Sequence, residues 1–94
     1  MKIVYLAKWK PGADQADIAA LLREAPGIFA RGPFVSCEHG EGLGLATRAD
    51  ASADWGFIID IAPSDFGTWR DSQAHEDLGR MLRPIIGEGM TIEF

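Results

Sequence analysis

The sequence has few of the residues on which cross-linked, metal-bound or nucleotide-bound domains depend. Cys37 is the single cysteine among 94 residues, which excludes an intrachain disulfide, a CxxC pair and a thiolate metal cluster. The two histidines, His39 and His75, stand in no HxxxH, HxH or HxxE spacing, so no metal site is expected. The glycines of residues 40–44 open no helix, and a nucleotide cofactor is therefore not expected either. The low cysteine content fits a reducing compartment, and we expect a cytoplasmic protein.

A basic cluster and a long apolar run are also lacking. Nine lysines and arginines stand against 14 aspartates and glutamates, which gives a formal net charge of −5, and the basic residues are scattered along the chain. This charge would repel a phosphate backbone, so nucleic acid is not an expected partner. The apolar stretch over residues 3–7 is too short for a signal-peptide core, and no stretch is long enough to span a membrane.

The residues that are present predict one folded domain over residues 1–94. An apolar fraction of 47% is ordinary for a globular protein, and the length suffices for one core. Period-two alternation of apolar side chains predicts strands, which we place at residues 2–9, 34–40, 55–62 and 90–94. A glycine-rich loop over roughly residues 41–53 is expected to be mobile.

Helical spacing predicts two helices between these strands. The first begins at Ala13 and is closed by Pro26-Gly27. The second follows an N-cap at Ser64 and continues to Ile85, with a break near residues 71–73, before Gly87 and Gly89 end it. The resulting order is the split βαβ pattern of the ferredoxin-like α+β fold, βαββαβ, in which a four-stranded antiparallel sheet carries both helices on one face.

The other face of this sheet is expected to be apolar as well. Val4, Leu6 and Ile58 lie on the opposite side of their strands from an aromatic-rich set formed by Tyr5, Trp9, Trp55 and Phe57. A sheet with one solvated face would carry polar residues there. Burying each such side chain contributes about 1.5–3 kcal/mol, so we predict a homodimer formed through the open sheet face.

Residues 4–22 and 65–94 resemble the stress-responsive dimeric A/B barrel family, often called Dabb. The most specific features are the Ala74-His75 pair, the Leu82-Arg83-Pro84 segment and the terminal hydrophobic-acidic-hydrophobic strand Ile92-Glu93-Phe94. The resemblance implies a ferredoxin-like protomer and a dimeric α/β barrel. It also implies that an activity is not assured, because most of the family has none assigned, while one plant branch consists of polyketide cyclases that work without a cofactor.

In that cyclase branch a histidine of the same motif acts as acid and base with a tyrosine six residues earlier, and a second histidine lies in the first strand. His75 matches the first histidine, whereas Trp69 replaces the tyrosine and Ile3 stands at the first-strand position. The resemblance thus implies His75 as the catalytic candidate, and Asp71, one helical turn earlier, could orient its ring. The alternative is an exposed or capping histidine at a helix start.

Aromatic residues are numerous for a domain of this size. We predict that Tyr5, Phe57 and Trp69 line a cleft between the sheet and the second helix, where an apolar or aromatic ligand would bury its surface. Core packing is the alternative. For His39, a solvated position at a strand end is favoured over a metal ligand.

Two functional hypotheses stay open. The first is a homodimeric stress-response domain that binds a small apolar or aromatic metabolite. The second is a cofactor-independent enzyme that uses His75, either polyketide cyclase-like or aromatic monooxygenase-like. The cyclases have a tyrosine where this chain has Trp69, and the lack of that hydroxyl favours the first hypothesis.

Overall fold

The computed structural model describes residues 1–45 and 52–94 and has the predicted ferredoxin-like order of elements. Those elements are β1 (Lys2–Trp9), α1 (Gln15–Ala30), β2 (Phe34–Glu41), β3 (Trp55–Ile61), the 3-10 helix η2 (Pro63–Asp65), α2 (Phe66–Arg70), α3 (Gln73–Leu82) and β4 (Ile86–Glu93). Within the described ranges the four strands form one antiparallel sheet in the order β2-β3-β1-β4. The predicted α+β class and four-stranded sheet are confirmed. The predicted loop over residues 41–53 falls in part on residues 46–51, which lie outside the described residues.

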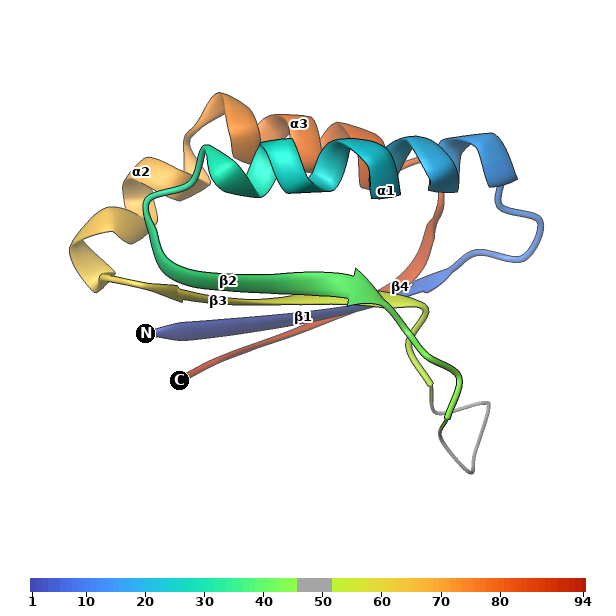
Figure 1. The fold of residues 1–94 in the computed structure, drawn as a ribbon, viewed down its shortest axis with the longest axis horizontal. Coiled ribbons are helices and arrows are strands. Elements are labelled where there is room, and N and C mark those ends of the chain that lie inside the picture. Colours follow the sequence, from blue (N-terminus) through green and yellow to red (C-terminus); the bar gives the residue numbers. More distant parts are fainter. Residues whose placement is uncertain (46–51) are drawn as a thin grey trace.

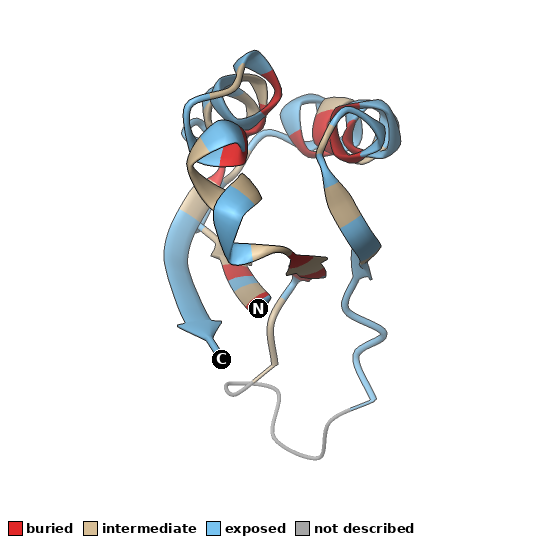
Figure 2. Cartoon of the chain, turned by 90° about the vertical axis from the view of Figure 1, so that its left-hand side faces the viewer, coloured by how far each residue is buried: buried red, intermediate tan, exposed pale blue. Residues whose placement is uncertain are grey.

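The molecule has two layers, with helices α1, α2 and α3 over one face of the sheet (Figure 1). Figure 2 shows that the buried residues gather where the helices and the sheet face each other. The largest side chains that are fully buried there are Trp55, Leu21, Ile59, Ile61 and Ile85. No helix in the described part of the chain has the length and apolar character needed to cross a membrane.

The register of the sheet decides which side chains share a face. Tyr5 on β1 stands opposite Phe57 on β3 and Thr91 on β4, and directly opposed residues point to the same side. Because Ile3 and Ala7 of β1 are buried under the helices, Tyr5 and its two partners also face the helices. The next residue, Val4, points to the open face.

Helix α1 continues through Pro26 and Gly27 to Ala30, so the predicted end of the first helix is wrong. A proline inside a helix costs about 3 kcal/mol. The turn that follows carries Ile28 and Phe29, which are buried against the sheet and contribute about 1.5–3 kcal/mol each. Burial in the tertiary structure therefore outweighs the local penalty.

The predicted N-cap at Ser64 is also wrong. Ser64 lies inside η2, whose N-cap is Ala62 and has no side-chain capping hydrogen bond. The predicted break near residues 71–73 is confirmed, because α2 ends at Arg70 and α3 begins at Gln73 with Ser72 as its N-cap.

Gly87 and Gly89 lie within β4, which begins at Ile86 rather than at residue 90. A β-carbon at Gly87 would lie 2.9 Å from the Cα of Lys10, and one at Gly89 would lie 2.6 Å from the hydroxyl of Tyr5. These glycines therefore allow a neighbouring chain or ring to approach the strand closely, and they do not end a helix.

The face of the sheet that the helices leave uncovered carries an apolar patch. We call this set the open-face patch; it consists of Val4, Leu6, Ile58, Met90, Ile92 and Phe94. All of these except Val4, which is partly buried, rank among the exposed large hydrophobic residues, with Met90 at 72% and Phe94 at 70%. A contiguous exposed apolar patch is a typical feature of surfaces that bind a partner.

Candidate functional site

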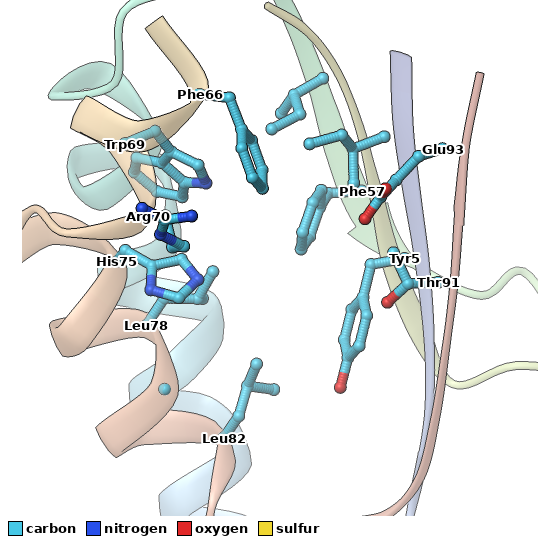
Figure 3. A pocket seen from close by; sticks show the side chains of 13 residues that line it. Tyr5, Phe57, Phe66, Trp69, Arg70, His75, Leu78, Leu82, Thr91 and Glu93 are labelled. Atoms are coloured by element: carbon cyan, nitrogen blue, oxygen red, sulfur yellow. The ribbon is translucent and has the colours of Figure 1, made fainter. Parts of the chain in front are cut away.

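A cavity of about 280 Å³ lies between the sheet and helices α2 and α3 (Figure 3). Its apolar lining comes from both layers and consists of Ile3, Phe57, Ile59, Phe66, Trp69, Leu78 and Leu82. Its polar lining is smaller and consists of Tyr5, Arg70, His75, Thr91 and Glu93, and Gly79 completes the wall. A mostly apolar cavity with a few convergent polar groups is the usual composition of a small-molecule site.

The four residues that sequence analysis singled out all line this cavity. Tyr5 and Phe57 reach it from the sheet, whereas Trp69 and His75 reach it from α2 and α3 (Figure 3). The sequence predicted a shared cleft for Tyr5, Phe57 and Trp69 but did not place His75 in it. Their roles in binding or catalysis stay predictions.

Two stacked rings form the sheet side of the cavity. The centroids of Tyr5 and Phe57 are 5.3 Å apart and their planes are inclined by 26°. This contact follows from the register, which sets the two residues directly opposite each other. Burial raises the pKa of the Tyr5 hydroxyl above its usual value of 10.0. The hydroxyl therefore stays protonated at neutral pH and can donate a hydrogen bond.

Ser72 holds the helical side of the cavity in place. Its hydroxyl donates to the carbonyl of Trp69 at 2.7 Å, and the same oxygen accepts from the backbone N–H of His75 at 3.1 Å. The second bond is the N-cap of α3, where a serine satisfies an otherwise unpaired N–H group. The imidazole of His75 then packs edge-on against the Trp69 ring, with centroids 5.4 Å apart.

Asp71 does not orient the His75 ring in this structure. Its carboxylate accepts hydrogen bonds from the Arg70 guanidinium at 3.2 and 3.4 Å. The hydrogen bond from Arg70 holds the pKa of Asp71 below its usual value. The charge of Arg70 is thus already matched, and its guanidinium carbon also lies 5.8 Å from the centroid of the Phe66 ring.

Phe66, Arg70, Thr91 and Glu93 also line the cavity, although they were not among the residues predicted from the sequence. The last two could have been found from the alternation of the terminal strand, since Thr91 and Glu93 stand on the side opposite Met90 and Ile92. Pairing with β1 turns that polar side toward the helices. Placing Phe66 and Arg70 requires the path of α2, which the sequence does not specify.

His39 lies outside this cavity. Its ring stacks on Phe29, with centroids 4.8 Å apart and planes inclined by 26°, at the exposed edge of β2. Within residues 1–45 and 52–94, no group of three histidine, cysteine or carboxylate side chains is arranged to hold a metal ion.

Comparison by sequence finds no relative, because no protein-family model matches the chain and no curated protein matches it significantly. Comparison by structure does find similar proteins. A dimeric ferredoxin-like protein of unknown function from Thermobifida fusca superposes with a TM-score of 0.85 at 15% identity, over 99% of this chain and 87% of the other. A Dabb family protein from Mesorhizobium loti has a TM-score of 0.75 at 14% identity, over 99% and 92%.

A third similar structure is an enzyme. The hydroxynitrile lyase of Passiflora edulis has a TM-score of 0.76 at 15% identity, over 99% of this chain and 89% of the lyase. Identities this low establish a shared fold and leave the activity open. The expected resemblance to Dabb proteins is therefore confirmed at the level of the ferredoxin-like fold.

Proposed function

We propose that this chain forms a Dabb-type homodimer whose cavity binds a small apolar or aromatic metabolite. The observation that carries the proposal is the 280 Å³ cavity, in which aromatic rings from both layers surround a few polar groups. Its volume is close to the lower end of the roughly 300–1,000 Å³ found for small-molecule sites, which fits a ligand built on one substituted ring. A role in the stress response belongs to the same proposal and rests on the sequence resemblance, whereas the proposed cytoplasmic location rests on the low cysteine content.

The dimer is proposed to form through the open-face patch. Leu6 and Ile58 at the centre of that patch are 46% and 44% exposed in the single chain, although they lie on the two inner strands of the sheet. Burial would stabilise an assembly by about 25 cal/mol for each Å² of apolar surface removed from water. The Thermobifida fusca protein of similar structure is described as dimeric, which supports a homodimer.

Ligand binding can be tested by titrating the protein with toluene and following the side-chain NMR signals of Trp69 and Leu78. Both residues line the cavity, so their signals should shift together and saturably. Thr91→Phe is the blocking variant, because Thr91 is an exposed strand residue whose side chain borders the cavity. Thr91→Val keeps the volume of threonine and is the matched control. Saturable shifts that survive in Thr91→Phe would contradict the proposed site.

A second candidate function, a cofactor-independent enzyme using His75, is favoured by the positions of Tyr5 and His75. Tyr5 and His75 both point into the cavity from opposite layers, so Tyr5 offers the hydroxyl that is lacking at position 69 (Figure 3). The lyase from Passiflora edulis supports the capacity of this fold for enzymatic chemistry, and cyclase-like and monooxygenase-like reactions are further candidates.

Cleavage of an aromatic cyanohydrin is the first reaction to assay. A base at His75 would take the hydroxyl proton while the carbon–carbon bond to the nitrile breaks and the aldehyde forms; the cyanide that leaves then takes that proton from the imidazolium and departs as hydrogen cyanide. His75→Gln should abolish aldehyde release and leave binding of toluene within about threefold. Equal rates of aldehyde release in the parent protein and in His75→Gln would eliminate His75 as the base.

A further inference from the structure

Strand β4 has its apolar and polar sides in the reverse of the usual arrangement. In a two-layer α+β domain the side facing the helices is expected to be apolar and the outer side polar. In β4 the side facing the helices carries Gly89, Thr91 and Glu93, whereas Met90 and Ile92 point to the open face. The polar side of β4 therefore borders the cavity and does not fill the core.

Glu93 is the charged group that this reversal brings to the cavity. Its register partner is Ile3, which is buried under the helices, so the carboxylate lies on the cavity side of the strand (Figure 3). The side chain of Glu93 is exposed and, among the described residues, makes no hydrogen bond and no ion pair. A carboxylate in that position accepts hydrogen bonds and donates none.

The opposing cationic group is already engaged. Arg70 is held by two hydrogen bonds to Asp71 and lies against the Phe66 ring, so its charge is matched within the protein. The cavity thus has an unmatched negative group on its sheet side and a matched positive group on its helical side. The formal net charge of −5 adds a general preference for cations over anions.

We propose that this cavity selects ring compounds that carry a hydrogen-bond donor, a protonated amine above all, and that Glu93 is the residue that selects them. The inference rests on the proposed ligand-binding function and specifies its ligand class. The ring lies against the stacked pair of Tyr5 and Phe57, and the donor group reaches Glu93 at the mouth of the cavity. The protonated hydroxyl of Tyr5 and the hydroxyl of Thr91 supply further hydrogen bonds to a substituent.

Three probes of similar size separate the ligand classes. Benzylamine, toluene and benzoate share one ring. Benzylamine carries a charged hydrogen-bond donor, toluene carries no polar group, and benzoate carries a charged acceptor. Binding of each can be followed by NMR titration. We expect benzylamine to bind at least tenfold more tightly than toluene, and benzoate to bind no more tightly than toluene. Toluene can make no hydrogen bond to Glu93, whereas the bond from the benzylamine ammonium group to the carboxylate is charge-assisted and belongs to the stronger kind, which supports a difference of this order.

Glu93→Gln keeps the size and the acceptor oxygen of the side chain but removes its charge. We expect this variant to bind benzylamine about tenfold more weakly than the parent protein does, and to bind toluene with unchanged affinity. Glu88→Gln is the matched control, because Glu88 lies on the same strand opposite Lys8 of β1, on the open face and away from the cavity. It should bind all three probes as the parent does.

The outcomes separate the inference from the function on which it rests. If toluene and benzylamine bind with equal affinity, or if Glu93→Gln leaves the preference for benzylamine intact, the ligand class is wrong and the pocket stands. Tighter binding of benzoate than of benzylamine would likewise overturn the inference and point to Arg70. If no probe binds in the cavity, the proposed function itself fails.

Discussion

The hydroxyl of Tyr5 lies directly over Gly89, 2.6 Å from the place that a β-carbon would occupy. The two residues come from adjacent strands, where Tyr5 pairs with Thr91 and Gly89 pairs with Ala7. The absence of a side chain at position 89 is what lets the tyrosine ring lie across β4 while it stacks on Phe57. The shape of the sheet side of the cavity therefore depends on a glycine that sequence analysis interpreted as the end of a helix.

Gly89→Ala should destabilise the protein by about 1–3 kcal/mol, because the added methyl group forces the Tyr5 ring or the strand to move. Urea unfolding followed by fluorescence measures this change. Gly27→Ala is the control: a β-carbon there meets nothing within 4 Å, and alanine favours the helix by about 0.5–1 kcal/mol. Equal effects at the two positions would show that the Tyr5 contact is unimportant.

Ser72→Ala should lower the free energy of unfolding by about 1 kcal/mol, because the first turn of α3 loses its cap and the Trp69 carbonyl loses a donor. Ser64→Ala is the matched comparison. Ser64 lies in η2, where no side-chain capping bond is formed, so its replacement should cost less than about 0.5 kcal/mol. Thermal unfolding of both variants measures the two losses of stability. A larger loss of stability in Ser64→Ala than in Ser72→Ala would contradict the observed caps.

Ile58→Lys should convert the proposed dimer into a monomer. Ile58 lies on β3 within the open-face patch, and a symmetric interface would bury two unpaired ammonium groups at a cost of several kcal/mol each. Light scattering coupled to gel filtration measures the mass. Leu43→Lys is the control, since Leu43 is 83% exposed and lies outside the sheet. A dimer that persists in Ile58→Lys would place the interface elsewhere.

The stability of the protein should fall in acid in part through Asp77, which joins α1 to α3. The Arg31 guanidinium donates to its carboxylate at 2.6 Å and Gln73 donates at 2.9 Å, and these hydrogen bonds hold the pKa of Asp77 below its ordinary value of 3.8. Because the folded pKa is the lower one, this stabilisation is complete above the unfolded value and is lost as the pH falls through the folded value.

Asp77→Asn should therefore be less stable than the parent near neutral pH, and the difference should shrink below about pH 4. Thermal unfolding at a series of pH values measures it. A difference that stays constant from neutral pH to acid would show that the charge of Asp77 does not contribute.

Much of the architecture could be predicted because it depends on local alternation. The strands at residues 2–9 and 55–62 are apolar on both sides, and this pattern predicted both the sheet and its apolar outer face. The helix boundaries were less predictable. Pro26 usually ends a helix, yet α1 continues past it because Ile28 and Phe29 are buried against the sheet. The energy of that contact comes from residues distant in the sequence.

By itself the sequence determined the class of fold and the apolar open face, because both depend on residue type and on spacing along one element. Aromatic residue type indicated Tyr5, Phe57 and Trp69 as candidates, and the family resemblance indicated His75. Only the tertiary structure decided that these four residues line one cavity with Arg70, Thr91 and Glu93. Antiparallel pairing of β4 with β1 turned the polar side of the terminal strand toward the helices, and the cap at Ser72 placed His75 beside Trp69. Strand register and helix junctions bring together residues that are far apart in the chain, and no local pattern encodes that proximity.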